Sequence, residues 1–180
     1  LAAHVLNSLR NRHNLDPVQI EDVFLGCANQ AGEDNRNVAR MALLLAGLPV
    51  TVPGETVNRL CASGMSAVIH AHQAIQSGDG ELFIAGGVEN MTRGPWVISK
   101  ASTSFGRDSR MEDTSFGWRF INPKLKEIYG TDSMGCTAEN LAEKYNISRE
   151  DQDSFAYHSQ MKAILAQKEG VFKNEITPIK

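Results

Sequence analysis

Cys61 is the residue whose type and surroundings point most directly to chemistry. It lies between residues 51–57, which are expected to be extended, and a helix expected over residues 65–76, at the first turn of that helix. Backbone N–H groups and the positive end of the helix dipole stabilise a thiolate at such a position. Residues 62–64 are small, so a bulky acyl group could approach the sulfur. This layout suits a nucleophilic cysteine, and a buried inert cysteine is the alternative that the local sequence leaves open.

The other cysteines and the histidines are weaker candidates. Cys27 ends an apolar run that predicts a buried strand, where an inert thiol is expected, and Cys136 begins a helix. His70 and His72 share the helix that follows Cys61, but His70 lies more than ~13 Å from the cysteine along a helix axis. The remaining histidines are expected at the surface: His4, His13 and His158. The sequence therefore offers a nucleophile without an evident base, and it predicts no metal site.

The elements that would position Cys61 follow a strand, helix, strand order. Buried strands are predicted at residues 23–28 and 81–87, on either side of the extended segment that leads to Cys61. Helices are predicted over residues 1–12, 38–46 and 65–76. The helix after Cys61 is expected to bury its large apolar side chains, which are Met65, Val68, Ile69 and Ile75. This order, with short connections, predicts a layered α/β fold.

The pattern changes from residue 94 onward. Residues 94–122 show little periodicity, and so long a loop inside a compact domain is uncommon unless it has a function. Helices return at residues 137–145 and again after Ser148, which is expected to cap a helix that Gly170 closes.

Composition excludes several classes of protein. The chain has 180 residues, 42% of them hydrophobic and 22% charged, which is typical of a globular protein. A net charge of −3 provides no cationic field for nucleic acid or anionic lipid. The longest nearly apolar stretch, residues 41–50, is far shorter than the roughly 20 residues that span a bilayer. Three dispersed cysteines favour a reducing compartment, so a cytoplasmic location is expected.

Several ordered motifs resemble those of the thiolases. Residues 57–64 (VNRLCASG) are similar to the nucleophile motif of this family, and this likeness favours Cys61 as the nucleophile. The other motifs follow in the family's order: residues 32–40 (GEDNRNVAR), 85–91 (AGGVENM), and 134–140 (MGCTAEN) with 147–153 (ISREDQD). The resemblance covers all 180 residues.

The resemblance implies a thiolase-like layered αβα fold. Residues 1–91 would form most of the N-terminal half-core without its first strand, and residues 92–180 part of the inserted CoA-binding loop domain. The chain opens within a helix, without Met, and ends at what reads as the start of a strand. A piece of a longer protein, inactive by itself and lacking the C-terminal thiolase domain, is therefore expected. Family members are homodimers or homotetramers, so the same assembly is expected here.

The resemblance also implies a reaction. Thiolases cleave a 3-oxoacyl-CoA with free CoA, which is a co-substrate, and they need no other cofactor. Cys61 would attack the 3-keto carbonyl, and its backbone N–H would help to hold the oxyanion. The activating histidine and a second cysteine would lie beyond Lys180. Met134 matches the family methionine that lines the acyl and pantetheine path, whereas Ser133 stands where many thiolases have a histidine.

Within the family, residues 111–123 (MEDTSFGWRFINP) are most similar to 3-oxoadipyl-CoA thiolases. Arg119 in this segment could bind the distal carboxylate of a dicarboxylic acyl chain, or it could serve packing among its aromatic neighbours. The expected function is cleavage of 3-oxoadipyl-CoA to succinyl-CoA and acetyl-CoA. The alternatives are an acetoacetyl-CoA or broad 3-ketoacyl-CoA thiolase, and a thiolase-fold protein that binds acyl-CoA without turnover.

Overall fold

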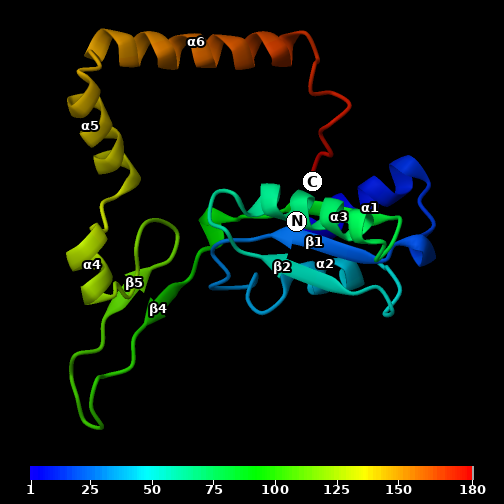
Figure 1. The fold of residues 1–180 in the computed structure, drawn as a ribbon, viewed down its shortest axis with the longest axis horizontal. Coiled ribbons are helices and arrows are strands. Elements are labelled where there is room, and N and C mark those ends of the chain that lie inside the picture. Colours follow the sequence, from blue (N-terminus) through cyan, green and yellow to red (C-terminus); the bar gives the residue numbers. More distant parts are fainter. Residues whose placement is uncertain (180) are drawn as a thin grey trace. The chain divides into compact units, whose positions relative to one another are not determined.

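The computed structural model describes residues 1–179, and its two compact units are Leu1–Phe116 and Gly117–Pro178 (Figure 1). The first unit extends past residue 91 because the next residues contact an earlier loop. Arg93 forms an ion pair with Glu33, and Pro95 lies against Gly32. The boundary between the two compact units therefore falls after Phe116. Compact units need not coincide with family domains, so the domain boundary expected after residue 91 stays a prediction.

A three-stranded parallel sheet organises the first unit. Its strands are β1 (Asp22–Gly26), β2 (Gly54–Val57) and β3 (Phe83–Gly87), in the spatial order β2-β1-β3. The chain leaves β1 toward one side and later crosses β1 to reach the other side. Right-handed connections in opposite directions place their helices on opposite faces. Accordingly, α2 (Val38–Leu45) packs on one face and α3 (Ser63–Ser77) on the other (Figure 1).

The strand side chains alternate between two apolar clusters. On one face, Val23 and Leu25 pack with buried residues of α2 and of α1 (Ala2–His13). On the other face, Phe24 packs with Ala67 of α3. This alternation follows from the two-residue period of a strand. The prediction of a layered α/β fold is confirmed, and the predicted strands and helices of this unit are present.

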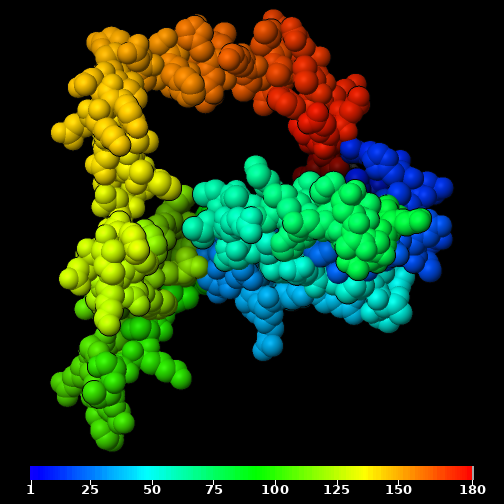
Figure 2. Space-filling view, in the orientation of Figure 1, coloured from blue at the N-terminus to red at the C-terminus, as the bar shows by residue number. Residues whose placement is uncertain are grey.

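Helix α3 differs from its prediction in the side chains that it buries. The sequence predicts that Met65, Val68, Ile69 and Ile75 are buried, but all four are exposed. The buried residues of α3 are small: Ser63, Ser66, Ala67 and Ala71. Small side chains let the helix approach the sheet so closely that a Cβ atom on Gly26 would lie 2.4 Å from the Ser63 carbonyl carbon. The large apolar side chains of α3 are therefore exposed on its outer face. Figure 2 shows that α3 itself lies at the surface of this unit.

Residues 94–122 contain regular structure that the sequence did not predict. Strands β4 (Trp96–Ile98) and β5 (Met111–Asp113) form an antiparallel hairpin, and α4 (Pro123–Tyr129) begins directly after this segment. Asn122 caps α4, and its side chain accepts hydrogen bonds from the backbone N–H groups of Lys124 and Leu125. Strands of three residues are too short to show a periodic pattern, which explains why they were missed.

The second unit consists of α4, α5 (Met134–Tyr145) and α6 (Arg149–Lys168). Both predicted helices are present, and Ser148 caps α6 by accepting a hydrogen bond from the Asp151 backbone N–H. None of residues 117–178 is buried. No helix within residues 1–179 combines the length and the apolar character that crossing a membrane requires.

Candidate active site

The carboxyl ends of the three parallel strands meet at one edge of the sheet, and Cys61 lies on a loop at this edge. The register pairs Gly26 with both Val57 and Gly87, which are the last residues of the three strands. The chain therefore leaves all three strands side by side. In open α/β sheets, ligands bind in the crevice outside these carboxyl ends.

The loop that carries Cys61 is tied to the loop after β1. The Asn58 side-chain amide donates to the Ala28 carbonyl oxygen at 3.1 Å, and its oxygen accepts from the Leu60 backbone N–H at 3.0 Å. One asparagine thus links the two loops and shapes the turn before the cysteine.

Cys61 is exposed, so its sulfur is accessible to a substrate. It lies just before α3 rather than in the first turn, because the helix begins at Ser63 and Ala62 occupies its N-cap position. The backbone N–H groups of Ala62 and Ser63 donate to carbonyl groups earlier in the loop, which delays the start of the helix. Within residues 1–179, the Cys61 backbone N–H has no hydrogen-bond partner. An accessible thiol and an available N–H group therefore belong to the same residue.

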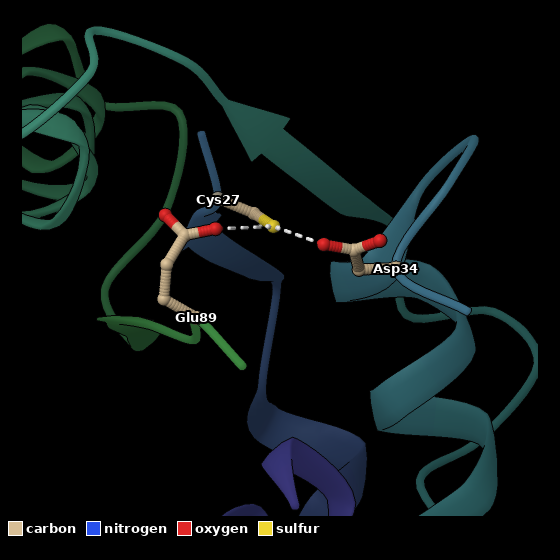
Figure 3. Close-up of side chains that lie close together, drawn as sticks. All are labelled: Cys27, Asp34 and Glu89. Carbon is tan, nitrogen blue, oxygen red and sulfur yellow. Dashed lines mark hydrogen bonds between the residues drawn. The ribbon is translucent and has the colours of Figure 1, made fainter. Parts of the chain in front are cut away.

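Cys27 lies at the same edge but is buried between two carboxylates (Figure 3). Its sulfur is 3.6 Å from Asp34 Oδ2 and 3.5 Å from Glu89 Oε1. Burial is the largest cause that raises the pKa of the Cys27 thiol, to about 12, and the two neighbouring negative charges act in the same direction. Cys27 is therefore a protonated thiol at neutral pH, as expected for an inert cysteine.

Cys27, Asp34 and Glu89 form a cluster whose ligand atoms lie within 4.8 Å of one another, a geometry that could hold a metal ion. Both carboxylates, however, already accept backbone hydrogen bonds. Glu89 accepts from the N–H groups of Ala28 and Asn29, and Asp34 accepts from those of Gln30 and Gly32. The cluster therefore ties the loop after β1 to itself through Asp34 and to the segment after β3 through Glu89, a role that explains its geometry without a metal.

Sequence reasoning did not identify this cluster. Cys27 and Asp34 stand in the loop after β1, but Glu89 follows β3, and the pairing of these two strands is not visible in either segment alone. The only signal was that Asp34 and Glu89 belong to two of the motifs that resemble thiolases.

The two other predicted site residues belong to the second unit. Met134 is the first residue of α5, and 71% of it is exposed. Ser133, at the position where the resemblance to thiolases led us to expect a histidine, caps this helix by accepting a hydrogen bond from the Cys136 backbone N–H. Arg119 is half-buried and lies between Trp118 and Phe120, both of which are exposed. The structure therefore places Cys61 in one unit and both proposed substrate contacts in the other.

The histidines of the described chain have other partners or lie at the surface. His70 Nδ1 lies 3.6 Å from a Glu55 carboxylate oxygen, and its ring contacts Phe24 edge-on. His158 Nδ1 lies 2.7 Å from the Ser154 carbonyl oxygen on α6. His4, His13 and His72 are exposed, as expected for the first two. No histidine of residues 1–179 forms a hydrogen bond with Cys61.

Comparison with known proteins identifies the family. The family described as "Thiolase, N-terminal domain" matches residues 1–180. The "Beta-ketoadipyl-CoA thiolase" of Pseudomonas knackmussii is 59% identical over 180 residues, which are 99% of this chain and 45% of that protein. The "3-oxoadipyl-CoA/3-oxo-5,6-dehydrosuberyl-CoA thiolase" of Escherichia coli K12 is 58% identical with the same coverage.

A solved structure agrees with these relatives. The crystal structure of the Bacillus anthracis acetyl-CoA acetyltransferase matches with a TM-score of 0.85 and 38% sequence identity, over 100% of this chain and 45% of that one. The chain belongs to the thiolase family and corresponds to its N-terminal domain. It is most similar, among the relatives named here, to thiolases named for 3-oxoadipyl-CoA. The chain spans somewhat less than half the length of these relatives.

Proposed function

We propose that the protein containing this chain is a thiolase that cleaves 3-oxoadipyl-CoA with CoA to succinyl-CoA and acetyl-CoA. The observation that carries the proposal is the exposed Cys61 with an available backbone N–H at the carboxyl edge of the sheet. The names of the relatives at 58–59% identity support the substrate. CoA is the co-substrate, and no further cofactor is proposed.

The first half-reaction forms an acyl-enzyme. The Cys61 thiolate attacks the 3-keto carbonyl, and the oxyanion accepts a hydrogen bond from the Cys61 backbone N–H. The bond between C2 and C3 then breaks. Its electron pair leaves on acetyl-CoA, whose α-carbon takes up a proton, and the succinyl group stays on the sulfur as a thioester.

The second half-reaction regenerates the enzyme. The thiolate of CoA attacks the succinyl thioester on Cys61, the bond between carbonyl carbon and Cys61 sulfur breaks, and succinyl-CoA leaves. The proton lost by the CoA thiol balances the proton that acetyl-CoA gained. The first step thus replaces a carbon–carbon bond by a thioester on Cys61, and only the second step exchanges one thioester for another.

Two residues of the second unit are proposed to bind substrate. Met134 would contact the acyl and pantetheine path, which suits an exposed apolar side chain at a helix start. Arg119 would bind the distal carboxylate of the dicarboxylic acyl chain through its planar guanidinium. We also propose that the full-length enzyme is a cytoplasmic homodimer or homotetramer, which sedimentation of the purified enzyme tests.

The test of the function uses the full-length natural enzyme and its Cys61→Ser variant. Wild type should release acetyl-CoA from 3-oxoadipyl-CoA and, without CoA, gain the mass of one succinyl group on the peptide that contains Cys61. Cys61→Ser should lose at least about 10³-fold in kcat. Cys136→Ser is the matched control and should keep its activity, because Cys136 is an exposed cysteine on another unit. Binding of acyl-CoA without turnover in wild type would contradict the proposal.

The substrate is tested by comparing 3-oxoadipyl-CoA with acetoacetyl-CoA. Arg119→Ala should lower kcat/KM for 3-oxoadipyl-CoA about 10-fold more than for acetoacetyl-CoA, which has no distal carboxylate. Arg107→Ala removes another arginine of the long connecting segment and should leave this ratio unchanged. An equal loss for both substrates would rule out the proposed role of Arg119. Higher wild-type turnover of acetoacetyl-CoA would favour the biosynthetic type of thiolase.

A further inference from the structure

Leu60, directly before Cys61, has a backbone conformation that needs support. Its φ angle is 50°, in the left-handed region that residues other than glycine adopt rarely. Such a conformation costs free energy and persists only where neighbouring contacts hold it. It also sets the direction in which the chain presents the next residue. The contacts that hold the backbone of Leu60 therefore also determine the orientation of Cys61.

Ser63 supplies most of these contacts. Its hydroxyl donates to the Leu60 carbonyl oxygen at 2.6 Å and accepts from the Arg59 backbone N–H at 2.9 Å. Its backbone N–H donates to the same Leu60 carbonyl oxygen at 3.0 Å. On the other side of Leu60, the backbone N–H donates to the Asn58 side-chain oxygen. One serine side chain thus closes the loop around Cys61.

Ser63 is itself fixed by the sheet. Only 4% of this residue is exposed, and its backbone lies directly against Gly26 at the carboxyl end of β1. The central strand therefore holds Ser63, Ser63 holds Leu60, and Leu60 is followed by the exposed cysteine.

We propose that Ser63 is a positioning residue for Cys61, because its buried hydroxyl holds Leu60 in the left-handed conformation that directs the cysteine. The proposal rests on the proposed function, since Cys61 is taken as the nucleophile. Ser63 does not touch the reacting atoms. Its loss should lower the rate of the chemical step more than the affinity for substrate, because a misplaced nucleophile reacts slowly even when substrate is bound.

The test compares Ser63→Ala with Ser77→Ala in the full-length enzyme. Ser77 is a matched control because its hydroxyl also donates to the carbonyl three residues earlier, that of Ala74, but at the other end of α3. Ser63→Ala should lower kcat about 10- to 100-fold and change KM less than about twofold. Amide hydrogen exchange of residues 58–62 should become about 10-fold faster. Ser77→Ala should change neither quantity.

A double-mutant cycle tests the route through Leu60. Glycine adopts positive φ readily, so Ser63→Ala should cost less kcat in a Leu60→Gly background than in wild type. An equal cost in both backgrounds, or an unchanged kcat in Ser63→Ala, would overturn the proposal. If Ser63→Ala does not fold, Asn58→Ala is the alternative. Asn58 is exposed, and its substitution removes the side-chain oxygen that accepts the hydrogen bond from the Leu60 backbone N–H. This substitution should then lower kcat several-fold, and an unchanged kcat would overturn the proposal.

Hydrogen exchange separates this proposal from the proposed function. Absence of thiolysis in the wild-type enzyme would overturn the proposed thiolase function. Faster amide exchange in Ser63→Ala would still show that Ser63 stabilises the loop before Cys61. Unchanged amide exchange in Ser63→Ala would show that Ser63 does not stabilise this loop, whatever reaction the enzyme catalyses.

Discussion

Two cysteines at one edge of the sheet have opposite surroundings. Cys61 is exposed on a loop, with an available backbone N–H, whereas Cys27 is buried between the carboxylates of Asp34 and Glu89. The same functional group is thus made accessible at one position and kept protonated at the other. The difference in accessibility and protonation between the two thiols comes from burial and neighbouring charge, because the residue type is the same.

The raised pKa of Cys27 predicts a loss of stability at alkaline pH. An unfolded thiol ionises near 9.0, whereas the folded thiol ionises near 12. Above pH 9 the unfolded state therefore loses a proton that the folded state keeps, and folding stability falls by about 1.4 kcal/mol per pH unit. Urea unfolding of wild type and Cys27→Ser between pH 8 and 11 measures this. The stability of wild type relative to Cys27→Ser should fall as the pH rises, and a constant difference would contradict the prediction.

The buried hydroxyl of Ser66 on α3 is a site where a substitution should stabilise the fold. This residue is 1% exposed, and its hydroxyl has no hydrogen-bond partner among residues 1–179. A buried hydroxyl without a partner is costly, so Ser66→Ala should raise the free energy of unfolding by about 1 kcal/mol. Ser63→Ala, which removes a hydroxyl with two partners, should lower it. Chemical unfolding of both variants measures the contrast, and destabilisation by Ser66→Ala would show that the hydroxyl has a partner.

At the scale of elements, the contact between α3 and β1 decides the geometry of the site. Small residues of α3 face the sheet, and Gly26 lets the first turn of the helix lie directly on the end of the central strand. The loop that carries Cys61 therefore packs against the end of the central strand. The outer face of α3 carries the larger apolar side chains, which are exposed and are not covered by another element of this unit.

Gly26→Ala should be strongly destabilising for this reason. The added Cβ would lie 2.4 Å from the Ser63 carbonyl carbon and 2.5 Å from the Gly64 nitrogen, and backbone atoms cannot move away as a flexible side chain could. A loss of about 3 kcal/mol or more is expected. Gly86→Ala in the neighbouring strand is the control, because its Cβ would meet only the Leu25 side chain, at 3.5 Å. Equal melting temperatures of the two variants would contradict the prediction.

At the scale of the whole molecule, the proposed nucleophile and the proposed substrate contacts belong to different units. Cys61 lies in a unit with a buried core, whereas Arg119 and Met134 lie in a unit without a buried residue. Few apolar contacts stabilise the second unit internally. Acyl-chain selectivity would therefore depend on the less stable part of the chain.

The exposed apolar face of α3 predicts that the 180-residue chain, expressed by itself, self-associates. Contiguous apolar surface drives association in water, and this face includes Met65, Val68 and Ile69. Val68→Glu should lower the average mass measured by light scattering, because it places a charge in the middle of this face. Gln73→Glu adds the same charge on another side of α3, where the side chain is also exposed, and serves as control. A monomeric wild-type chain would contradict the prediction.

The sequence by itself determined the nucleophile candidate, the order of the main elements and the family. Cys61 could be recognised because its motif is local, and the strands and longer helices because their apolar patterns repeat within a few residues. Helix ends were also readable, since Ser148 and Gly170 are capping residues with local effects.

Only the tertiary structure decided which groups meet. The sequence could not show that α3 turns its small side chains to the sheet, because apolarity alone favoured the face of Met65 and Val68. Nor could it show that Cys27 lies between Asp34 and Glu89, or that Ser63 supports the loop of Cys61. Strand register brings Glu89 to Cys27. The close approach of helix to sheet fixes Ser63, whose contact with Leu60 spans only three residues but requires the left-handed conformation of Leu60. These contacts depend on backbone distances in the folded chain, which residue types in a local window do not encode.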